Sequence, residues 1–253
     1  MTSSGRSVAT LGIARVVYFT LQILRTNLLP FSALALIVAG SVAVMRYLEA
    51  SLPDESMFTS PALALSVVTY AICDAMLTAV ITKSIVPDET GDLPLLARSV
   101  QTAVNDFVAL SAIAIAAFVL FIAGYIFLVL PGLLIGTILA VVIPVRILEK
   151  TSFVQTFIRS AQLTSGNRWP IFGLLLALFV TTFAAEAVVN VLAGDPVLAG
   201  YTEEMRTGGT LSIIGSTLVE FVASLVNATA TAVVYIELRQ IKPGPAALAS
   251  EFD

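Results

Sequence analysis

Histidine is absent from this 253-residue chain, cysteine occurs once, as Cys73, and only 12% of the residues are charged. Without histidine, His-based metal sites and Ser-His-Asp or Cys-His catalytic arrangements are excluded, and one cysteine cannot form an intramolecular disulfide. Glycine-rich phosphate loops and basic tracts suited to nucleic acid are missing as well. We therefore expect a non-enzymatic protein with no cofactor and no nucleic-acid partner.

The chain is rich in apolar residues instead. It is 58% hydrophobic with a mean hydropathy of +0.97, whereas soluble domains are about 45–50% apolar and about 25% charged. Six apolar stretches approach the roughly 20 residues that a membrane span requires, at 28–48, 62–83, 107–129, 132–148, 170–193 and 211–237. The predicted fold is an all-α integral membrane protein with one domain over residues 1–242 and a disordered tail over 243–253.

Proline and glycine suggest how the spans are connected. Pro131 and Gly132 are typical of a tight turn, so we expect the third and fourth spans to form a hairpin. Pro144 should kink the fourth span near its end. Residues 8–26 carry apolar residues at helical spacing opposite Arg15 and Arg25, which predicts an amphipathic helix lying in the membrane interface rather than a secretory signal.

The distribution of basic residues predicts the orientation. With a cytoplasmic N-terminus, 11 of the 13 Lys and Arg residues lie on the inner side, and only Arg46 and Arg206 lie outside. An excess of Lys and Arg in inner loops is the usual signature of membrane proteins. We therefore expect a multi-pass membrane protein with both termini in the cytoplasm.

One short motif occurs twice. Residues 98–101 and 159–162 both read Arg-Ser-x-Gln, and each precedes an apolar run by way of an asparagine, Asn105 or Asn167. Before the first span, Asn27 and Pro30 are spaced like Asn167 and Pro170. These matches predict a unit repeated three times, made of an amphipathic cytoplasmic helix, an asparagine that can cap the next helix, and a hairpin of two spans. The alternative is that Arg, Ser and Asn are simply common at inner membrane junctions.

Residues 130–176 carry a resemblance to a known family, together with the closing stretch "TAVVYIELR" at 231–239. The matching positions are Pro131, Gly132, Pro144, Glu149, Arg159, Ser160, Leu163, Thr164, Gly166 and Trp169. They resemble the YciC-like bacterial membrane proteins and the related membrane domain found attached to some glycerophosphodiester phosphodiesterases. The resemblance implies a six-span inner-membrane protein with no assigned chemistry and no hydrolase domain.

Polar residues recur every third or fourth position in the second, fifth and sixth spans. The candidate intramembrane polar site that they define comprises Asp74, Glu186, Asn190, Glu220 and Asn227. Lipid disfavours such faces, so we expect these three helices to turn them toward each other or toward a cavity. One interpretation is that the residues form hydrogen bonds that hold the bundle together. The other is a cavity that handles protons, cations or small solutes.

Two functional hypotheses follow. The first is a component that contacts or organises lipids and membrane partners through a basic cytoplasmic face. Its candidate headgroup contacts are Arg15, Arg25, Arg98, Arg146, Arg159 and Arg168, and its expected partners are the lipid bilayer, anionic phospholipid, and another membrane protein or a second copy of the chain. The alternative is a transporter or channel for small solutes, cations or protons that uses the intramembrane carboxylates.

Overall fold

The computed structural model describes residues 11–51, 61–87, 94–127, 129–193 and 209–242, and the secondary structure of these residues is entirely helical. The helices are α1 (Ile13–Ser51), α2 (Pro61–Ile85), α3 (Leu96–Asn105), α4 (Phe107–Phe127), α5 (Val129–Leu139), α6 (Val142–Glu149), α7 (Phe153–Thr164), α8 (Arg168–Leu192) and α9 (Gly209–Ile241). The predicted all-α class is confirmed for this part of the chain. The tail predicted at 243–253 lies outside the described residues.

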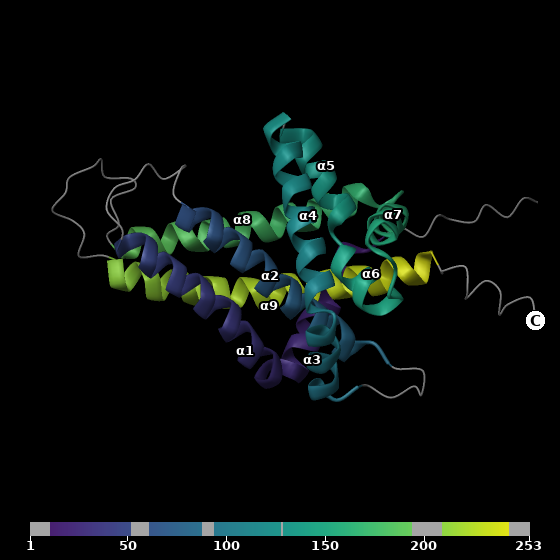
Figure 1. Ribbon diagram of the computed structural model, residues 1–253, viewed down its shortest axis with the longest axis horizontal. Helices are drawn as coiled ribbons and strands as arrows, with labels where there is room; N and C mark the ends of the chain where they lie inside the picture. Colours follow the sequence, from purple (N-terminus) through teal and green to yellow (C-terminus); the bar gives the residue numbers. More distant parts are fainter. Residues whose placement is uncertain (1–10, 52–60, 88–93, 128, 194–208, 243–253) are drawn as a thin grey trace, which may run out of the picture.

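Five helical segments are long and apolar enough to cross a membrane, which indicates a multi-pass membrane protein. They are Ile13–Val44, Leu65–Ile85, Phe107–Gly124, Arg168–Leu192 and Leu211–Ile241. Helix α9 is central to the packing, because α1, α2 and α8 all contact it (Figure 1). Buried side chains of α9, among them Leu225 and Ala228, join Phe31 of α1 and Leu77 of α2 in one apolar cluster.

The segment predicted as a fourth span, 132–148, is not one continuous helix. It is divided between α5 and α6, with a break at Ala140 and Val141. Pro144 explains the position of the break, because proline has no N–H to donate to the carbonyl four residues earlier, that of Ala140, and its ring crowds that carbonyl. The Ser160 hydroxyl donates a hydrogen bond of 2.6 Å to the carbonyl of Ile138 beside the break. Pro144 thus ends one helix and lies in the first turn of the next.

Helix α1 contains residues 13–26 of the predicted interfacial helix and the whole predicted first span. The two parts meet at a kink, where Asn27 has non-helical angles of φ −122° and ψ 24°. Proline at position 30 lies three residues further on, so the helix restarts with Pro30 in a first turn, where a missing N–H is tolerated. Figure 1 shows α1 changing direction in this region.

Two other junctions have nearly the same backbone conformation as Asn27. Asp106, between α3 and α4, has φ −94° and ψ 11°, and Asn167, between α7 and α8, has φ −119° and ψ 18°. The junction residue is therefore Asp106 rather than the predicted Asn105. With this correction Arg98 and Arg159 each precede their junction by eight residues, and the match needs no gap.

Burial follows the same register at all three junctions. The hydroxyl residue seven positions before each junction is buried: Thr20, Ser99 and Ser160. The large apolar residue four positions after each junction is at most 1% exposed: Phe31, Leu110 and Ile171. Each short amphipathic segment and the long helix after it therefore turn equivalent positions inward.

The asparagines at these junctions do not cap their spans as predicted. The Asn27 amide donates to the carbonyl of Ile23 at 3.2 Å, and Asn105 accepts a hydrogen bond from Gln101 at 3.0 Å. Asn167 Oδ1 accepts a buried hydrogen bond of 2.9 Å from the backbone N–H of Leu11. The last contact fastens the chain just before α1 to the junction just before α8, which sequence spacing could not indicate.

Helices α4 and α5 pack against each other and project from the side of the other long helices (Figure 1). The connection between them differs from the prediction, because α4 ends at Phe127 and α5 already begins at Val129. Pro131 and Gly132 therefore lie within the first turns of α5. Gly124 faces Gly132 closely, since a Cβ added at Gly124 would lie 3.0 Å from the Cα of Gly132.

Candidate functional site

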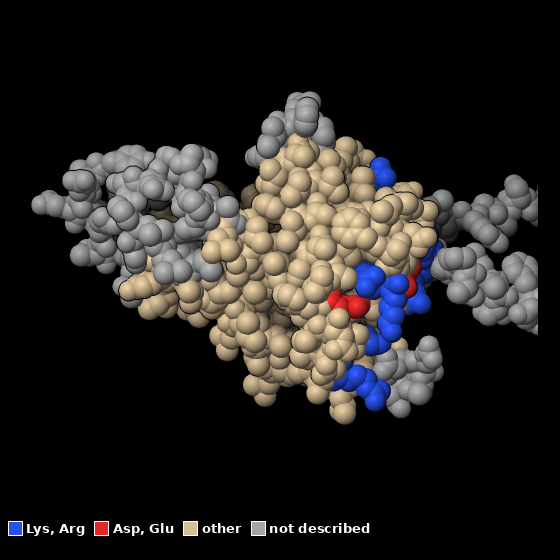
Figure 2. All heavy atoms as spheres, in the orientation of Figure 1, with Lys and Arg blue, Asp and Glu red and all other residues tan. Residues whose placement is uncertain are grey.

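Basic residues gather at one end of the protein. Figure 2 shows the lysines and arginines of the visible face at the end formed by α3, α6, α7 and the last turns of α9, while the other described residues on that face carry almost no charge. The side chains of the six candidate arginines fall into two groups by exposure. Arg146 and Arg159 are half-buried in ion pairs, whereas Arg15, Arg25, Arg98 and Arg168 are exposed.

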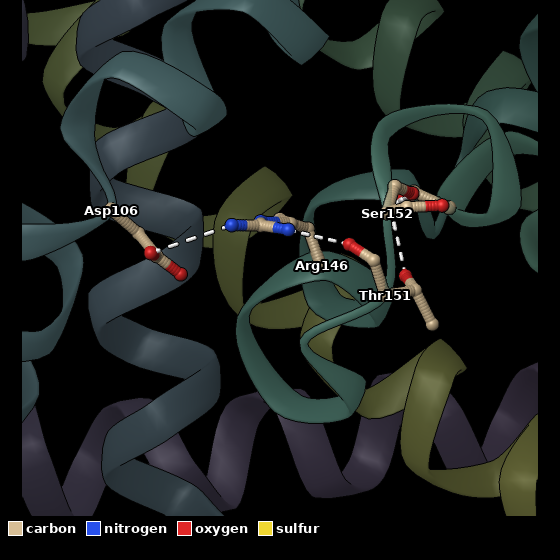
Figure 3. Close-up of polar contacts among 5 residues, drawn as sticks. Asp106, Arg146, Thr151 and Ser152 are labelled. Carbon is tan, nitrogen blue, oxygen red and sulfur yellow. Dashed lines mark hydrogen bonds and ion pairs between the residues drawn. The ribbon is translucent and has the colours of Figure 1, made fainter.

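Arg146 connects the α3–α4 junction to the loop after α6. Its guanidinium lies 3.5 Å from the Asp106 carboxylate and donates a hydrogen bond to the carbonyl oxygen of Thr151 (Figure 3). The side chains of Arg146 and Asp106 are only 19% and 29% exposed. Arg146 therefore has an internal structural partner on each side.

Arg159 belongs to a second network, between α6, α7 and α9. Its Nε lies 3.0 Å and 3.3 Å from the two carboxylate oxygens of Glu149, and the Tyr235 hydroxyl donates to the same carboxylate at 3.0 Å. Tyr235 is fully buried, and the Arg159 and Glu149 side chains are 16% and 19% exposed. This network holds three helices together at the charged end.

Further polar contacts bind α9 to α1 and α7. Arg15 lies 3.5 Å from Glu237, and Lys242 Nζ donates to the carbonyl of Gln162 at 2.8 Å and to that of Ser165. The lysine thus satisfies carbonyls at the C-terminal end of α7, where a positive charge is favourable. Sequence reasoning missed Glu237 and Lys242 as partners, because their contacts join residues far apart in the chain.

Positive charge is concentrated around the turn between α7 and α8. Partial burial, followed by the nearby charges of Arg168 and Arg159, lowers the pKa of Lys242. Arg168 is exposed and forms no ion pair with the described residues, and neither does the exposed Arg25 on α1. Trp169 is 78% exposed beside Arg168, as expected of an aromatic anchor at a membrane interface. This turn therefore offers an uncompensated positive charge next to an interfacial aromatic residue.

The intramembrane polar residues separate into two contacts on either side of α9. On one side, the Tyr70 hydroxyl of α2 hydrogen-bonds to the Glu220 carboxyl, and Asp74 lies close enough to Glu220 for their charges to interact. The Oδ1 atom of Asp74 is buried and accepts no hydrogen bond from the described residues. This contact supports the prediction that α2 and α9 turn their polar faces toward each other.

The second contact joins α8 to α9. Ser216 donates a hydrogen bond of 2.8 Å to Glu186, and Ser212 donates one of 3.2 Å to Asn190. Both contacts are hydrogen bonds between membrane helices, as expected if the polar stripes hold the bundle together. Glu186 and Asn190 therefore form part of the α8–α9 packing, apart from the α2–α9 contact.

Asn227 takes part in neither of these two contacts. Together with Thr182 it lines a groove of about 430 Å³ between α8 and α9, whose other walls include Leu178, Leu218 and Val222. None of the three intramembrane carboxyls lines this groove. The structure therefore does not unite the five predicted residues in one site. Within the described residues, no three His, Cys, Asp or Glu side chains are grouped so as to hold a metal ion.

Comparison with known proteins gives no match. No protein-family model, curated protein or solved structure matches this chain. The resemblance to the YciC-like proteins stays a prediction.

Proposed function

We propose that the protein is a non-enzymatic component of a bacterial inner membrane that holds anionic phospholipid at its basic end. The observation that carries the proposal is the pair of exposed arginines without ion-pair partners among the described residues, Arg25 and Arg168. Arg98 and Arg15, also exposed, add positive charge to the same end, although Arg15 is paired with Glu237. A lipid phosphate can accept hydrogen bonds from guanidinium groups at this level of the membrane.

Apolar residues beside these charges support the same proposal. Helix α7 exposes Phe153, Val154 and Ile158, although it is short and carries polar residues as well. Amphipathic helices of this kind lie at the boundary between headgroups and acyl chains. A protein anchored in this way presents its arginines at the depth of the phosphate groups.

The test is a change of charge at the two exposed arginines. We expect Arg25→Gln with Arg168→Gln to weaken binding of phosphatidylglycerol about 30-fold, because each basic residue near an anionic surface contributes about 1 kcal/mol. Native mass spectrometry of the detergent-purified chain, titrated with phosphatidylglycerol and phosphatidylcholine, measures the preference. The matched control is the Arg25→Lys, Arg168→Lys pair, which keeps the charges and should keep most of the preference. Equal binding of the two lipids by the wild-type protein would contradict the proposal.

The finer architecture is part of the proposal. We infer three repeated units, each with an interfacial helix, a junction at Asn27, Asp106 or Asn167, and two spans, with the basic end in the cytoplasm. The common junction angles and the common burial register support the repeat. In this architecture α5 and α6 together form the fourth span, which is broken.

A second candidate function is proton or small-cation passage by way of the α2–α9 contact. Asp74 favours it, because its buried Oδ1 lacks a hydrogen bond from the described residues and lies near a second carboxyl. A carboxylate in a membrane needs a proton, a cation or hydrogen-bond donors.

Flux into dye-loaded liposomes tests this candidate. We expect proton or cation flux in the wild type and a fall to the level of empty liposomes in Asp74→Asn and in Glu220→Gln. The control is Glu237→Gln, which changes a carboxyl at the charged end and should leave flux intact. Absence of flux in wild-type liposomes under proton, sodium and potassium gradients would exclude the candidate.

A further inference from the structure

The groove between α8 and α9 has the dimensions of a small-molecule site. Its volume of about 430 Å³ falls within the range of roughly 300–1,000 Å³ that such sites usually occupy. It lies within the membrane-spanning segments Arg168–Leu192 and Leu211–Ile241, and none of the described residues that line it is charged. A ligand that binds there must therefore be lipid-soluble and uncharged.

Two polar side chains in the groove are available to such a ligand. The Asn227 amide and the Thr182 hydroxyl form no hydrogen bond with the described residues. Thr181, which also lines the groove, differs because its hydroxyl already donates to the carbonyl of Ala177 at 2.7 Å. An amide without a partner is strongly unfavourable in hydrocarbon. An occupant that accepts hydrogen bonds from Asn227 and Thr182 removes this penalty.

The depth of Asn227 and Thr182 in the membrane limits which class of ligand the groove can bind. Thr182 lies 14 residues after Arg168 and Asn227 lies 12 residues before Arg239, which at a rise of 1.5 Å per residue places both about 20 Å from the charged end. A bilayer with its headgroups is roughly 40–45 Å thick, so both groups lie near its centre. Phospholipids keep their ester oxygens close to the headgroups and cannot present them at this depth.

We propose that the α8–α9 groove binds an uncharged, lipid-soluble carbonyl compound of the quinone type. One of its two ring carbonyl oxygens accepts a hydrogen bond from Asn227 and the opposite one from Thr182, and its ring and chain lie against Leu178, Leu218 and Val222. The site is independent of the proposed lipid contacts at the basic end, because the groove lies about 20 Å away along the helices. Either proposal can therefore fail without the other.

The experiment is a titration of the detergent-purified full chain with decylubiquinone, followed by native mass spectrometry. We expect one molecule to bind per chain, and binding to weaken at least tenfold in Asn227→Leu and in Thr182→Val. Thr182→Ser, which keeps the hydroxyl, should restore binding. The control variant is Thr217→Val, which makes the same chemical change outside the groove, where the hydroxyl is bonded to the carbonyl of Ile213. Decylbenzene, which has no carbonyl oxygen, serves as the control ligand and should bind at least tenfold more weakly.

Four results would overturn the proposal. Equal binding of decylbenzene and decylubiquinone would mean that the groove binds hydrocarbon chains and does not recognise a carbonyl group. Decylubiquinone binding that is unchanged in both Asn227→Leu and Thr182→Val would place the ligand elsewhere. A dimer of the wild-type chain that is lost in Asn227→Leu would mean that a helix of a second copy occupies the groove. Absence of decylubiquinone binding to the folded wild-type chain would also contradict it.

Discussion

Replacing Arg159 with alanine is expected to lower the free energy of unfolding by about 3 kcal/mol. The change leaves the largely buried Glu149 carboxylate with the Tyr235 hydroxyl as its remaining partner in this network, and removing one member of a buried ion pair typically costs about 3–5 kcal/mol. The lower end of this range applies because the Arg159 and Glu149 side chains are both partly exposed. Titration of the purified protein with sodium dodecyl sulfate in mixed micelles measures the difference.

A double-mutant cycle separates this ion pair from general damage. Arg159→Met combined with Glu149→Leu removes both charges, so the double variant should be more stable than Arg159→Met alone, because no charge is left without a partner. Tyr235→Phe should have a smaller effect, of about 1 kcal/mol, since it removes one hydrogen bond and keeps the ring. If the double variant proves no more stable than Arg159→Met alone, the cost comes from lost packing rather than from the stranded carboxylate.

Gly124→Val is expected to destabilise the α4–α5 pair by about 3 kcal/mol. A Cβ at this position would lie 2.5 Å from Cδ1 of Ile135 and 3.0 Å from Cα of Gly132. The isoleucine end can move, but the backbone of Gly132 cannot move without separating the two helices. Overpacking of a close contact costs roughly 1–3 kcal/mol, and a β-branched residue belongs at the upper end. Detergent unfolding of the variant measures the loss.

A second glycine provides the control. Gly40 lies in α1, and a Cβ added there meets no atom within 4 Å. Gly40→Ala should therefore be neutral or stabilising by up to about 1 kcal/mol, because alanine favours the helix. If Gly124→Val leaves stability unchanged, α4 and α5 do not pack closely in the membrane.

Much of the secondary structure was predictable because long apolar runs have few alternatives in lipid. A backbone that crosses hydrocarbon must satisfy its own hydrogen bonds, so each long apolar run forms a helix. Proline then places the interruptions, since Pro30 and Pro144 lie just after the kink at Asn27 and the break at Val141. The structure differs from the single span predicted over 132–148, because the proline near the end of this short apolar run divides the helix instead of bending it.

The division of the intramembrane polar residues was not predictable in the same way. Residues four apart on a helix rotate by about 40° relative to one another, since each turn holds 3.6 residues. Along α9 this drift turns Ser212 and Ser216 toward α8 and Glu220 toward α2. A stripe that reads as one face in the sequence therefore serves two neighbours, and only the positions of α2 and α8 around α9 reveal this.

The sequence by itself determined that the chain is helical, that its long helices suit a bilayer, and that its basic residues lie near helix ends. These properties depend on the residues of one segment at a time. Only the tertiary structure decided which charges are paired, because Asp106 and Arg146 are 40 residues apart and Arg15 and Glu237 are 222 apart. Those pairings distinguish the half-buried Arg146 and Arg159 from the exposed Arg25 and Arg168. Pairing over such separations depends on how the helices pack, and no local pattern of residues records it.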